Sequence, residues 1–222
     1  MLTFAAVADG DELTARPAAR WRAGDGTYLE RWESPLAEVE RLTCTIAPDL
    51  PVGMAVEECW AVLWRFVALS EIQRFEASGR LARGPRVSPG SGDSGQYLHA
   101  LQFEGDGWHL HIGTEDDEAL QLRSAEGQLP TRWHELPLVS YGRPGLLSRL
   151  AAWLGRPHVE PLFDMDFDEE RLIVGLPPLV PGDRGELQFV AAWHRPRDAH
   201  DVSSWYAVER PTDEILRQAA CR

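Results

Sequence analysis

Apolar side chains recur at helical spacing between residues 55 and 81. Trp60, Leu63, Trp64 and Val67 are separated by intervals that place side chains on one face of an α-helix. In the middle of this segment nearly every position is apolar, which is typical of a helix buried on all sides. The pattern therefore predicts one long, largely buried helix.

Alternating apolar and polar positions indicate short strands elsewhere in the chain. The alternating segments are residues 27–32, 42–47, 97–104, 108–113, 120–123, 171–176 and 186–193. The third and fourth flank Gly105-Asp106-Gly107, which is typical of a tight β-hairpin, and the last two predict a second hairpin. Together with the helix, these segments predict an α+β fold in which an antiparallel sheet of hairpins packs on one long, largely buried helix.

The first hairpin also predicts which side chains face the core. A two-residue turn at Gly105-Asp106 places Leu101 opposite Leu110 on an apolar face that packs inward. His109 and His111 then point together to the other face, because side chains two positions apart on a strand share a side.

A segment rich in glycine and serine, residues 84–95, interrupts the pattern of strands. Such a composition is typical of a flexible connector, so this loop is the best internal boundary. It is too weak a signal to divide the chain. We therefore expect residues 1–222 to form a single domain, a length that suits one domain.

The charge of the chain is strongly negative. It has 35 acidic and 22 basic residues, a formal net charge of −13, and every basic residue is arginine. The sequence contains neither lysine nor asparagine, and this joint absence is most simply explained by a GC-rich genome. A field this negative repels nucleic acid and anionic membranes, and it favours a basic protein partner.

Cysteine usage and hydropathy indicate the cytoplasm. Cys44, Cys59 and Cys221 are few, odd in number and widely spaced, which favours reduced thiols over a disulfide framework or a zinc site. No stretch approaches the eighteen apolar residues that a membrane-spanning helix requires.

Two histidines raise the question of a metal site. His109 and His111 share one face of the predicted strand, and Glu115 follows as a possible third ligand. This arrangement resembles the first half of the cupin metal motif, and the resemblance implies a metal-dependent enzyme. Phe103 stands where the motif has glycine, and the usual second half requires an asparagine that this chain lacks. The alternative is a pair of exposed strand histidines beside an acidic loop.

Two acidic runs are candidates for partner binding. They comprise Glu115, Asp116, Asp117, Glu118, Asp164, Asp166, Asp168, Glu169 and Glu170. Grouped carboxylates steer a basic protein and orient it on approach. Phe167 and Trp108 lie near these runs and are expected to anchor such a partner. The alternative is that both runs form ordinary solvated surface.

No complete catalytic motif is present, so no catalytic residue and no cofactor are predicted. The hairpin continues into Gly113-Thr114-Glu115-Asp116-Asp117-Glu118, and a later segment reads Gln188-Phe189-Val190-Ala191-Ala192-Trp193. With these features the chain resembles the immunity proteins that neutralise polymorphic toxins. The resemblance implies one-to-one binding of a toxin, often a basic nuclease. A structural or scaffold subunit is a third hypothesis, and it predicts a large apolar patch for self-association.

Overall fold

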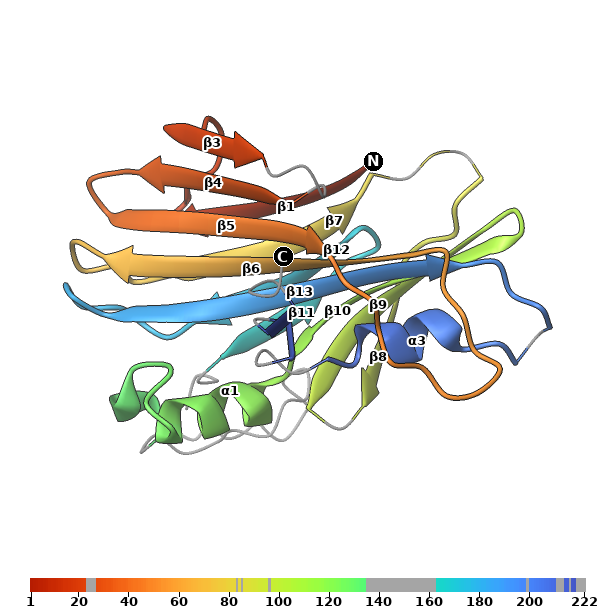
Figure 1. Cartoon of the computed structure of the whole chain (residues 1–222). Helices are drawn as coiled ribbons and strands as arrows, with labels where there is room; N and C mark the ends of the chain where they lie inside the picture. Colours follow the sequence, from red (N-terminus) through yellow and green to blue (C-terminus); the bar gives the residue numbers. More distant parts are fainter. Residues whose placement is uncertain are drawn as a thin grey trace, which may run out of the picture.

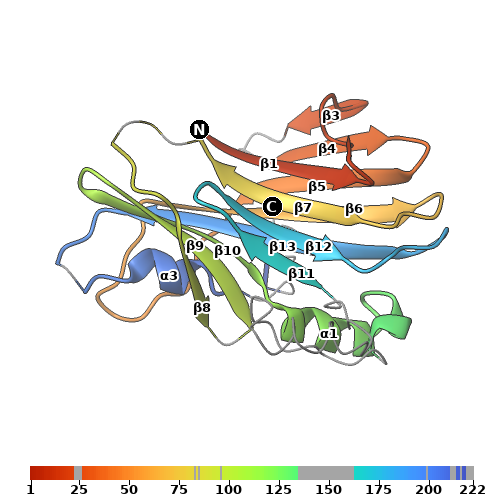
Figure 2. The same ribbon diagram turned by 180° about the vertical axis from the view of Figure 1, so that it is seen from behind.

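Two antiparallel β-sheets packed face to face form the body of the protein in a computed structural model (Figure 1; Figure 2 shows it from behind). The structure describes residues 1–22, 27–82, 84, 86–95, 97–134, 163–198, 200–210, 214–215 and 217–218. The smaller sheet has five strands in the order β11-β12-β7-β1-β2, and the larger has eight in the order β3-β4-β5-β6-β13-β10-β9-β8.

The strands are contributed from all parts of the described chain. Those of the smaller sheet are β1 (Leu2–Ala8), β2 (Asp11–Glu12), β7 (Phe75–Leu81), β11 (Asp164–Phe167) and β12 (Arg171–Leu176). Those of the larger sheet are β3 (Ala19–Arg22), β4 (Tyr28–Glu33), β5 (Ala37–Thr45), β6 (Glu58–Ala68), β8 (Ser91–Gly95), β9 (Leu98–Gly105), β10 (Trp108–Glu115) and β13 (Arg184–His194).

The labelled helical elements of the described residues are short. They are α1 (Asp117–Ala125), a single 3-10 turn at Thr131–Trp133, and α3 (Ser203–Val208). The side chain of Asp116 caps α1 by accepting a hydrogen bond of 2.8 Å from the backbone N–H of Ala119. Within the described part of the chain, no helix has the length and apolar character needed to cross a bilayer.

The main core lies between the two sheets. Phe4 of β1 meets Phe189 of β13 at a ring distance of 5.8 Å, and Phe66 of β6 meets Phe75 of β7 at 4.9 Å. Alternate residues of the central strands, such as Val62, Trp64 and Phe66 of β6, enter this layer, as expected for sheets packed at about 10 Å. Burial of these aromatic rings provides much of the driving force that holds the sandwich together.

The predicted long helix is wrong, and so is the α+β fold class. Residues 55–81 form β6 and β7, two strands that belong to different sheets. The helical spacing arose because β6 is buried on both faces along much of its length. Trp64 and its even-numbered neighbours face the other sheet, whereas Cys59 and Ala61 pack under α3 on the outer face. A short apolar run of this kind cannot be distinguished from a buried helix by periodicity alone.

The first hairpin is confirmed as β9 and β10, with a register two residues away from the predicted one. Leu110 lies opposite Phe103, and Ile112 lies opposite Leu101. The turn falls at Asp106-Gly107, where Gly107 adopts a positive φ of 76°. A shift of two residues preserves the faces of a strand, so the predicted inward set of apolar side chains is correct.

The second predicted hairpin is wrong. Strands β12 and β13 do form, but β12 lies in the small sheet and β13 in the large one. Residues 177–183 therefore pass from one sheet to the other instead of turning back beside β12. Part of the predicted flexible loop is also a strand, because β8 pairs with β9 from Ser91 to Gly95 at the edge of the large sheet.

Candidate ligand-binding site

The outer face of the large sheet carries α3, which contacts β10 and β13, whereas α1 follows the end of β10 (Figure 1). A second, smaller core fills the space under α3. It includes Cys44, Ile46, Cys59, Ala61, Leu98, Ala100, Val190, Ala192, Ala207, Val208 and Ile215. Gly113 of β10 allows the close approach of α3, because a Cβ at that position would lie 2.9 Å from the Val208 side chain.

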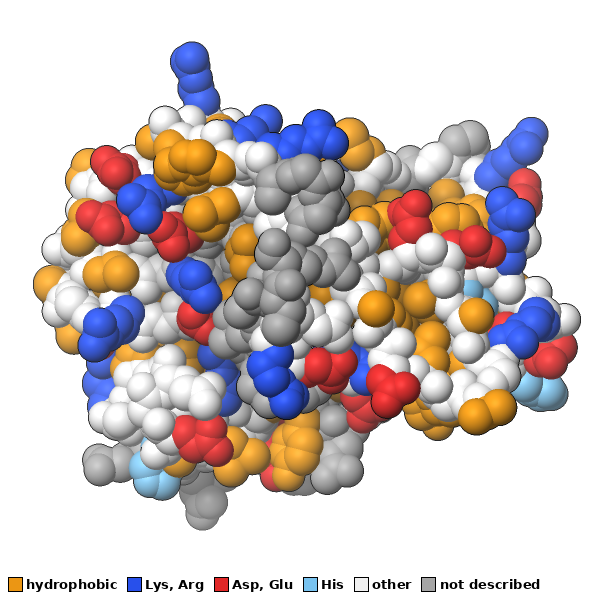
Figure 3. Space-filling model, in the orientation of Figure 1, with side chains coloured by type: hydrophobic (Ala, Val, Ile, Leu, Met, Phe, Trp, Pro, Cys, Tyr) orange, Lys and Arg blue, Asp and Glu red, His pale blue; other side chains and the backbone are white. Residues whose placement is uncertain are grey.

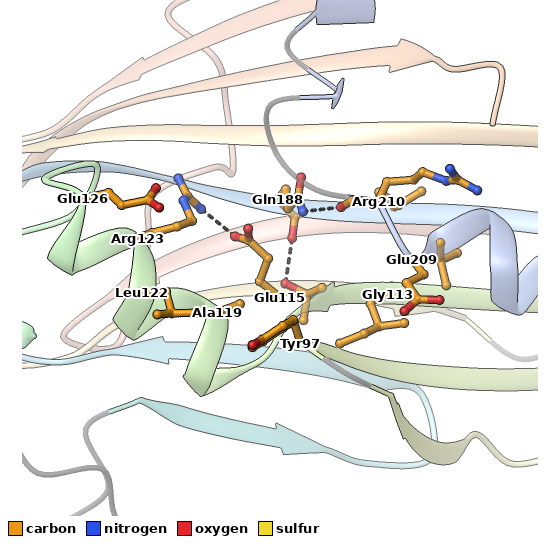
Figure 4. Close-up of a pocket in the computed structure, with 14 residues that line it drawn as sticks. Tyr97, Gly113, Glu115, Ala119, Leu122, Arg123, Glu126, Gln188, Glu209 and Arg210 are labelled. Atoms are coloured by element: carbon orange, nitrogen blue, oxygen red, sulfur yellow. Dashed lines mark hydrogen bonds and ion pairs between the residues drawn. The ribbon is translucent and has the colours of Figure 1, made fainter. Parts of the chain in front are cut away.

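A cavity of about 340 Å³ opens between α1 and the end of α3 (Figure 4). Sites for small molecules occupy about 300 to 1,000 Å³, so this volume suits a compact ligand. The cavity is lined by Tyr97, Leu98, Gly113, Thr114, Glu115, Ala119, Leu122, Arg123, Glu126, Gln188, Val190, Val208, Glu209 and Arg210. We call this site the α1 cavity.

Two large apolar side chains of the α1 cavity are exposed to solvent. Leu122 of α1 is 50% exposed and Tyr97 is 41% exposed. Tyr97 also adopts a positive φ of 63°, a conformation that costs energy for a residue with a bulky side chain. Strain of this type concentrates at binding sites, where the surrounding structure maintains it.

Both arginines of the α1 cavity are engaged by the protein itself. The Arg123 side chain donates to Glu115 Oε2 at 2.5 Å and to Gln128 Oε1 at 3.0 Å. The side chains of Arg123 and Glu115 are 8% and 12% exposed, so this ion pair is largely shielded from water. Arg210 donates to two backbone oxygens, and in Figure 4 its guanidinium extends away from the other labelled side chains.

Two carboxylates at the ends of the α1 cavity are more exposed than that of Glu115. Glu126 at the C-terminal cap of α1 and Glu209 after α3 are exposed, and among the described residues neither forms an ion pair with an arginine. Glu126 accepts a hydrogen bond of 3.0 Å from Gln128 Nε2. Figure 4 shows Glu126 and Glu209 on opposite sides of the Glu115 carboxylate. The lining therefore has three carboxylates against two guanidinium groups.

A buried polar network holds α3 against the sheet beside the α1 cavity. The Ser204 hydroxyl lies 2.7 Å from His111 Nδ1 and 2.8 Å from His194 Nδ1. His194 Nε2 lies 3.2 Å from the backbone oxygen of Asp201. Ser204 has no exposed surface, and His111 and His194 are almost completely buried. The network therefore joins β10, β13 and α3 out of contact with water.

One assignment of protons satisfies every contact in this network. His194 donates from Nε2 to Asp201 and accepts at Nδ1 from the Ser204 hydroxyl, which in turn accepts from His111 Nδ1–H. Both imidazoles are neutral in this scheme. Burial lowers the pKa of His111 to about 3, and the charges of His194 and His109 add to this effect. Burial also lowers the pKa of His194.

The combination of serine, histidine and aspartate does not form a catalytic site here. A nucleophile must reach its substrate, and the Ser204 hydroxyl is enclosed between α3 and two strands. The network can instead fix the position of α3, and with it residues 208–210, which line the α1 cavity.

Substitution of Ser204 by alanine is expected to destabilise the protein by about 1–3 kcal/mol, because both buried imidazoles lose their hydroxyl partner. Chemical denaturation at neutral pH measures the effect. Tyr206→Ala is the control, since Tyr206 lies on the same helix with 40% of its surface exposed and is expected to cost less. Equal stability of Ser204→Ala and the wild-type protein would contradict a structural role for the network.

Comparison with known proteins adds two distant structural likenesses. No family model matches the sequence, and no curated protein matches it. A putative kojibiose phosphorylase from human microbiome is 7% identical, with a TM-score of 0.46 over 99% of this chain. A bacterial glucoamylase complexed with acarbose is 8% identical, with a TM-score of 0.46 over 98%. The chain spans 25% and 30% of the length of these two proteins.

The structure does not bring the three predicted metal ligands together. His111 contacts Ser204, and Glu115 is paired with Arg123. Glu115 lies four positions beyond His111 on the extended strand β10, a distance of about 13 Å. Within the described ranges, no group of three His, Cys, Asp or Glu side chains has the geometry of a metal site. His111 lies buried under α3, and the alternative of two exposed strand histidines is wrong for this residue.

The first acidic run is mostly engaged in local structure. Glu115 pairs with Arg123, Asp116 caps α1, and Asp117 and Glu118 occupy the first turn of that helix. Acidic residues stabilise this end of a helix through its dipole. Asp116 is half-buried, and this burial raises the pKa of its carboxyl group. Only Asp117 and Glu118 are left as candidates for contact with a partner.

The second acidic run is on β11 and the turn that follows it, at the edge of the small sheet. Three of its carboxylates pair with arginines: Asp164 with Arg74, Asp168 with Arg171, and Glu170 with Arg80. In each pair at least one of the two side chains is exposed. The Asp166 side chain accepts from the backbone N–H of Phe167. Figure 3 likewise shows acidic and basic side chains interspersed over the face seen in Figure 1.

Several residues of the site had no signal in the sequence. Leu122 lies on α1 and Glu126 caps its C-terminal end, but the alternation of residues 120–123 predicted a strand there. Ser204 reaches His111 across 93 positions of sequence. The acidic residues before an apolar segment at Asp116 were the one local signal, since aspartate is a common helix N-cap.

Proposed function

We propose that the protein acts in the cytoplasm by binding a basic protein partner, in the manner of an immunity protein that neutralises a toxin, and that it performs no chemistry of its own. The proposal rests on Phe167, which is 48% exposed within the acidic segment 164–170. An exposed aromatic ring surrounded by charge is typical of the anchor of a protein interface.

The position of Phe167 supports this role. It ends β11, the edge strand of the small sheet, and its ring lies over Gly92 of β8, where a Cβ would be 2.2 Å from the ring. The ring is therefore supported from beneath and open above. Trp108, the other expected anchor, is partly buried against the main core, so the proposal uses Phe167 alone.

The arginines near this segment do not prevent such binding. Arg171 and Asp168 are 48% and 46% exposed at their side chains, and exposed ion pairs of this kind contribute about 0–1 kcal/mol. The cationic groups of a partner can therefore replace them at small cost. The net charge of −13 adds long-range attraction that accelerates encounter with a basic protein.

Substitution of Phe167 by alanine is expected to weaken partner binding by about tenfold or more, because the anchor is lost. The measurement is capture of the partner from the native host, followed by titration of the purified pair. Leu69→Ala is a matched control, since Leu69 is also 48% exposed and lies outside both acidic runs. It is expected to leave binding unchanged.

The salt dependence of the same complex tests the electrostatic part of the proposal. Screening shortens the reach of charges to about 3 Å at 1 M salt, so the affinity is expected to fall steeply as salt rises. An affinity independent of ionic strength, or an equal loss for Leu69→Ala and Phe167→Ala, would refute docking at this segment.

A further inference from the structure

The α1 cavity has an apolar wall and an acidic rim. Leu98, Ala119, Leu122, Val190 and Val208 provide the wall. We infer that the α1 cavity binds an organic cation, meaning an ammonium or guanidinium group attached to a compact apolar body. The inference concerns a different surface from the acidic segment around Phe167, and it stands independently of the proposed function.

The size and exposure of the α1 cavity define the apolar part of the ligand. A volume of about 340 Å³ accommodates one aromatic ring or a short aliphatic chain with its charged group. Leu122 and Tyr97 leave apolar surface exposed at the site, and a ligand that covers it gains about 25 cal/mol for each Å² removed from water.

The arginines of the cavity disfavour an anionic ligand, because each is already paired with a carboxylate. Arg123 already donates to Glu115 and Gln128, and Arg210 donates to the backbone oxygens of Asp49 and Tyr206. Arg210 also lies 3.6 Å from the Glu214 carboxylate, so the positive charge of both arginines is already balanced by the protein. Moving Arg123 from Glu115 to an anionic ligand would take a counter-charge away from a shielded carboxylate, which is costly.

The carboxylates favour a cation. Glu126 and Glu209 are exposed at the two ends of the site, and Glu115 lies between them (Figure 4). The three carboxylates exceed the two guanidinium groups, so the lining is left with one negative charge. Tyr97 adds an aromatic ring to the same surface, and such rings attract ammonium and guanidinium groups.

This chemistry has two sources in a cell. One is a free small amine, and the other is a lysine or arginine side chain presented by a protein. Both place a cation at the end of an apolar stem, and the two are distinguished by comparing phenethylamine with Nα-acetyl-lysine methylamide as probes. Tighter binding of phenethylamine assigns a free amine, whereas tighter binding of the lysine derivative assigns a protein side chain.

The test uses three probes that share one body and differ in charge. Phenethylamine, 2-phenylethanol and phenylacetate are titrated into the full chain, and binding is measured by calorimetry and by the shift in melting temperature. Phenethylamine is expected to bind at least about tenfold more tightly than the alcohol, and phenylacetate is expected not to bind. Equal affinity for all three probes, or no binding of phenethylamine, would overturn the inference.

A pair of double variants separates local from general electrostatics. The variant Glu126→Gln/Glu209→Gln is expected to weaken phenethylamine binding by about tenfold while the affinity for 2-phenylethanol is unchanged. The control, Glu33→Gln/Glu38→Gln, removes the same charge from two exposed glutamates paired across β4 and β5. An equal loss in both double variants would show that net charge, and not the α1 cavity, attracts the amine.

Discussion

Replacement of Arg123 by methionine is expected to destabilise the protein by about 3–5 kcal/mol, because it removes one partner of an ion pair that is largely shielded from water. The reason is the environment of Glu115. Its side chain is 12% exposed and loses a donor at 2.5 Å, while methionine offers it no hydrogen bond. Gln128 loses its contact with the Arg123 side chain at the same time. Denaturant unfolding at neutral pH measures the loss.

Two further variants show whether burial of the pair is the cause. Arg171→Met breaks an ion pair whose partners are 48% and 46% exposed, and it is expected to cost no more than about 1 kcal/mol. The double variant Glu115→Gln/Arg123→Met is expected to recover part of the stability, because it removes the charge that Arg123 neutralised. A cost for Arg123→Met similar to that for Arg171→Met would contradict the shielded ion pair.

The sequence predicted those parts of the fold that depend on local pattern. The hairpin of β9 and β10 and the strands near residues 27–32 and 42–47 were expected from alternation, and each is present. The assignment of residues 55–81 failed because α3 and the C-terminal segment cover the outer face of β6. A strand covered on both faces loses its alternation, and nothing local distinguishes it from a buried helix.

The sequence also could not predict which strands belong to which sheet. Strands β12 and β13 are adjacent in sequence, and adjacency favours a hairpin. The crossing at residues 177–183 depends instead on packing between the sheets, such as that of Phe189 against Phe4. Such contacts are not encoded in any window of sequence.

In the candidate site too, local features could be predicted from the sequence and long-range contacts could not. Glu115 was singled out from the sequence for both metal and partner binding, but its actual partner, Arg123, lies on a helix that was expected to be a strand. His111 was assigned to the correct face of its strand. The identity of the group that covers it depended on α3, whose Ser204 is remote in sequence. Residue types and faces were therefore predictable, and their partners were not.

Acidification is expected to destabilise the protein by about 3 kcal/mol between pH 7 and about pH 4.5, chiefly through His111. Its pKa falls from 6.5 in the unfolded chain to about 3 in the folded protein, since it is buried beside His109 and His194. Above pH 6.5 both states are neutral and the stability is independent of pH. Below it, the unfolded chain takes up a proton that the folded protein excludes, so stability falls as the pH falls.

The second histidine of the network is also expected to lower the stability of the protein as the pH falls. His194 also has a lowered pKa, because burial together with His109 and Arg197 outweighs the opposing charge of Asp201. The pKa of Asp201 is itself lowered, mainly by hydrogen bonds from Ser203 and the backbone, so it stays ionised over this range. Protonation of His194 removes the acceptor of the Ser204 hydroxyl, and protonation of His111 adds a charge to the buried network. Ser204 has only one hydroxyl for the two rings. The release of α3 is the expected structural consequence.

The free energy of unfolding measured at several pH values tests this linkage. Its slope against pH does not depend on how strongly a substitution destabilises the protein at any one pH. His111→Gln keeps an amide that can donate to Ser204 but cannot be protonated, so the slope of stability against pH is expected to fall by about 1.4 kcal/mol per unit below pH 6.5. His134→Gln is the control, because His134 is exposed and is expected to leave the slope unchanged. If His111→Gln keeps the wild-type slope, the acid sensitivity arises elsewhere and α3 is not held by a neutral pair of histidines.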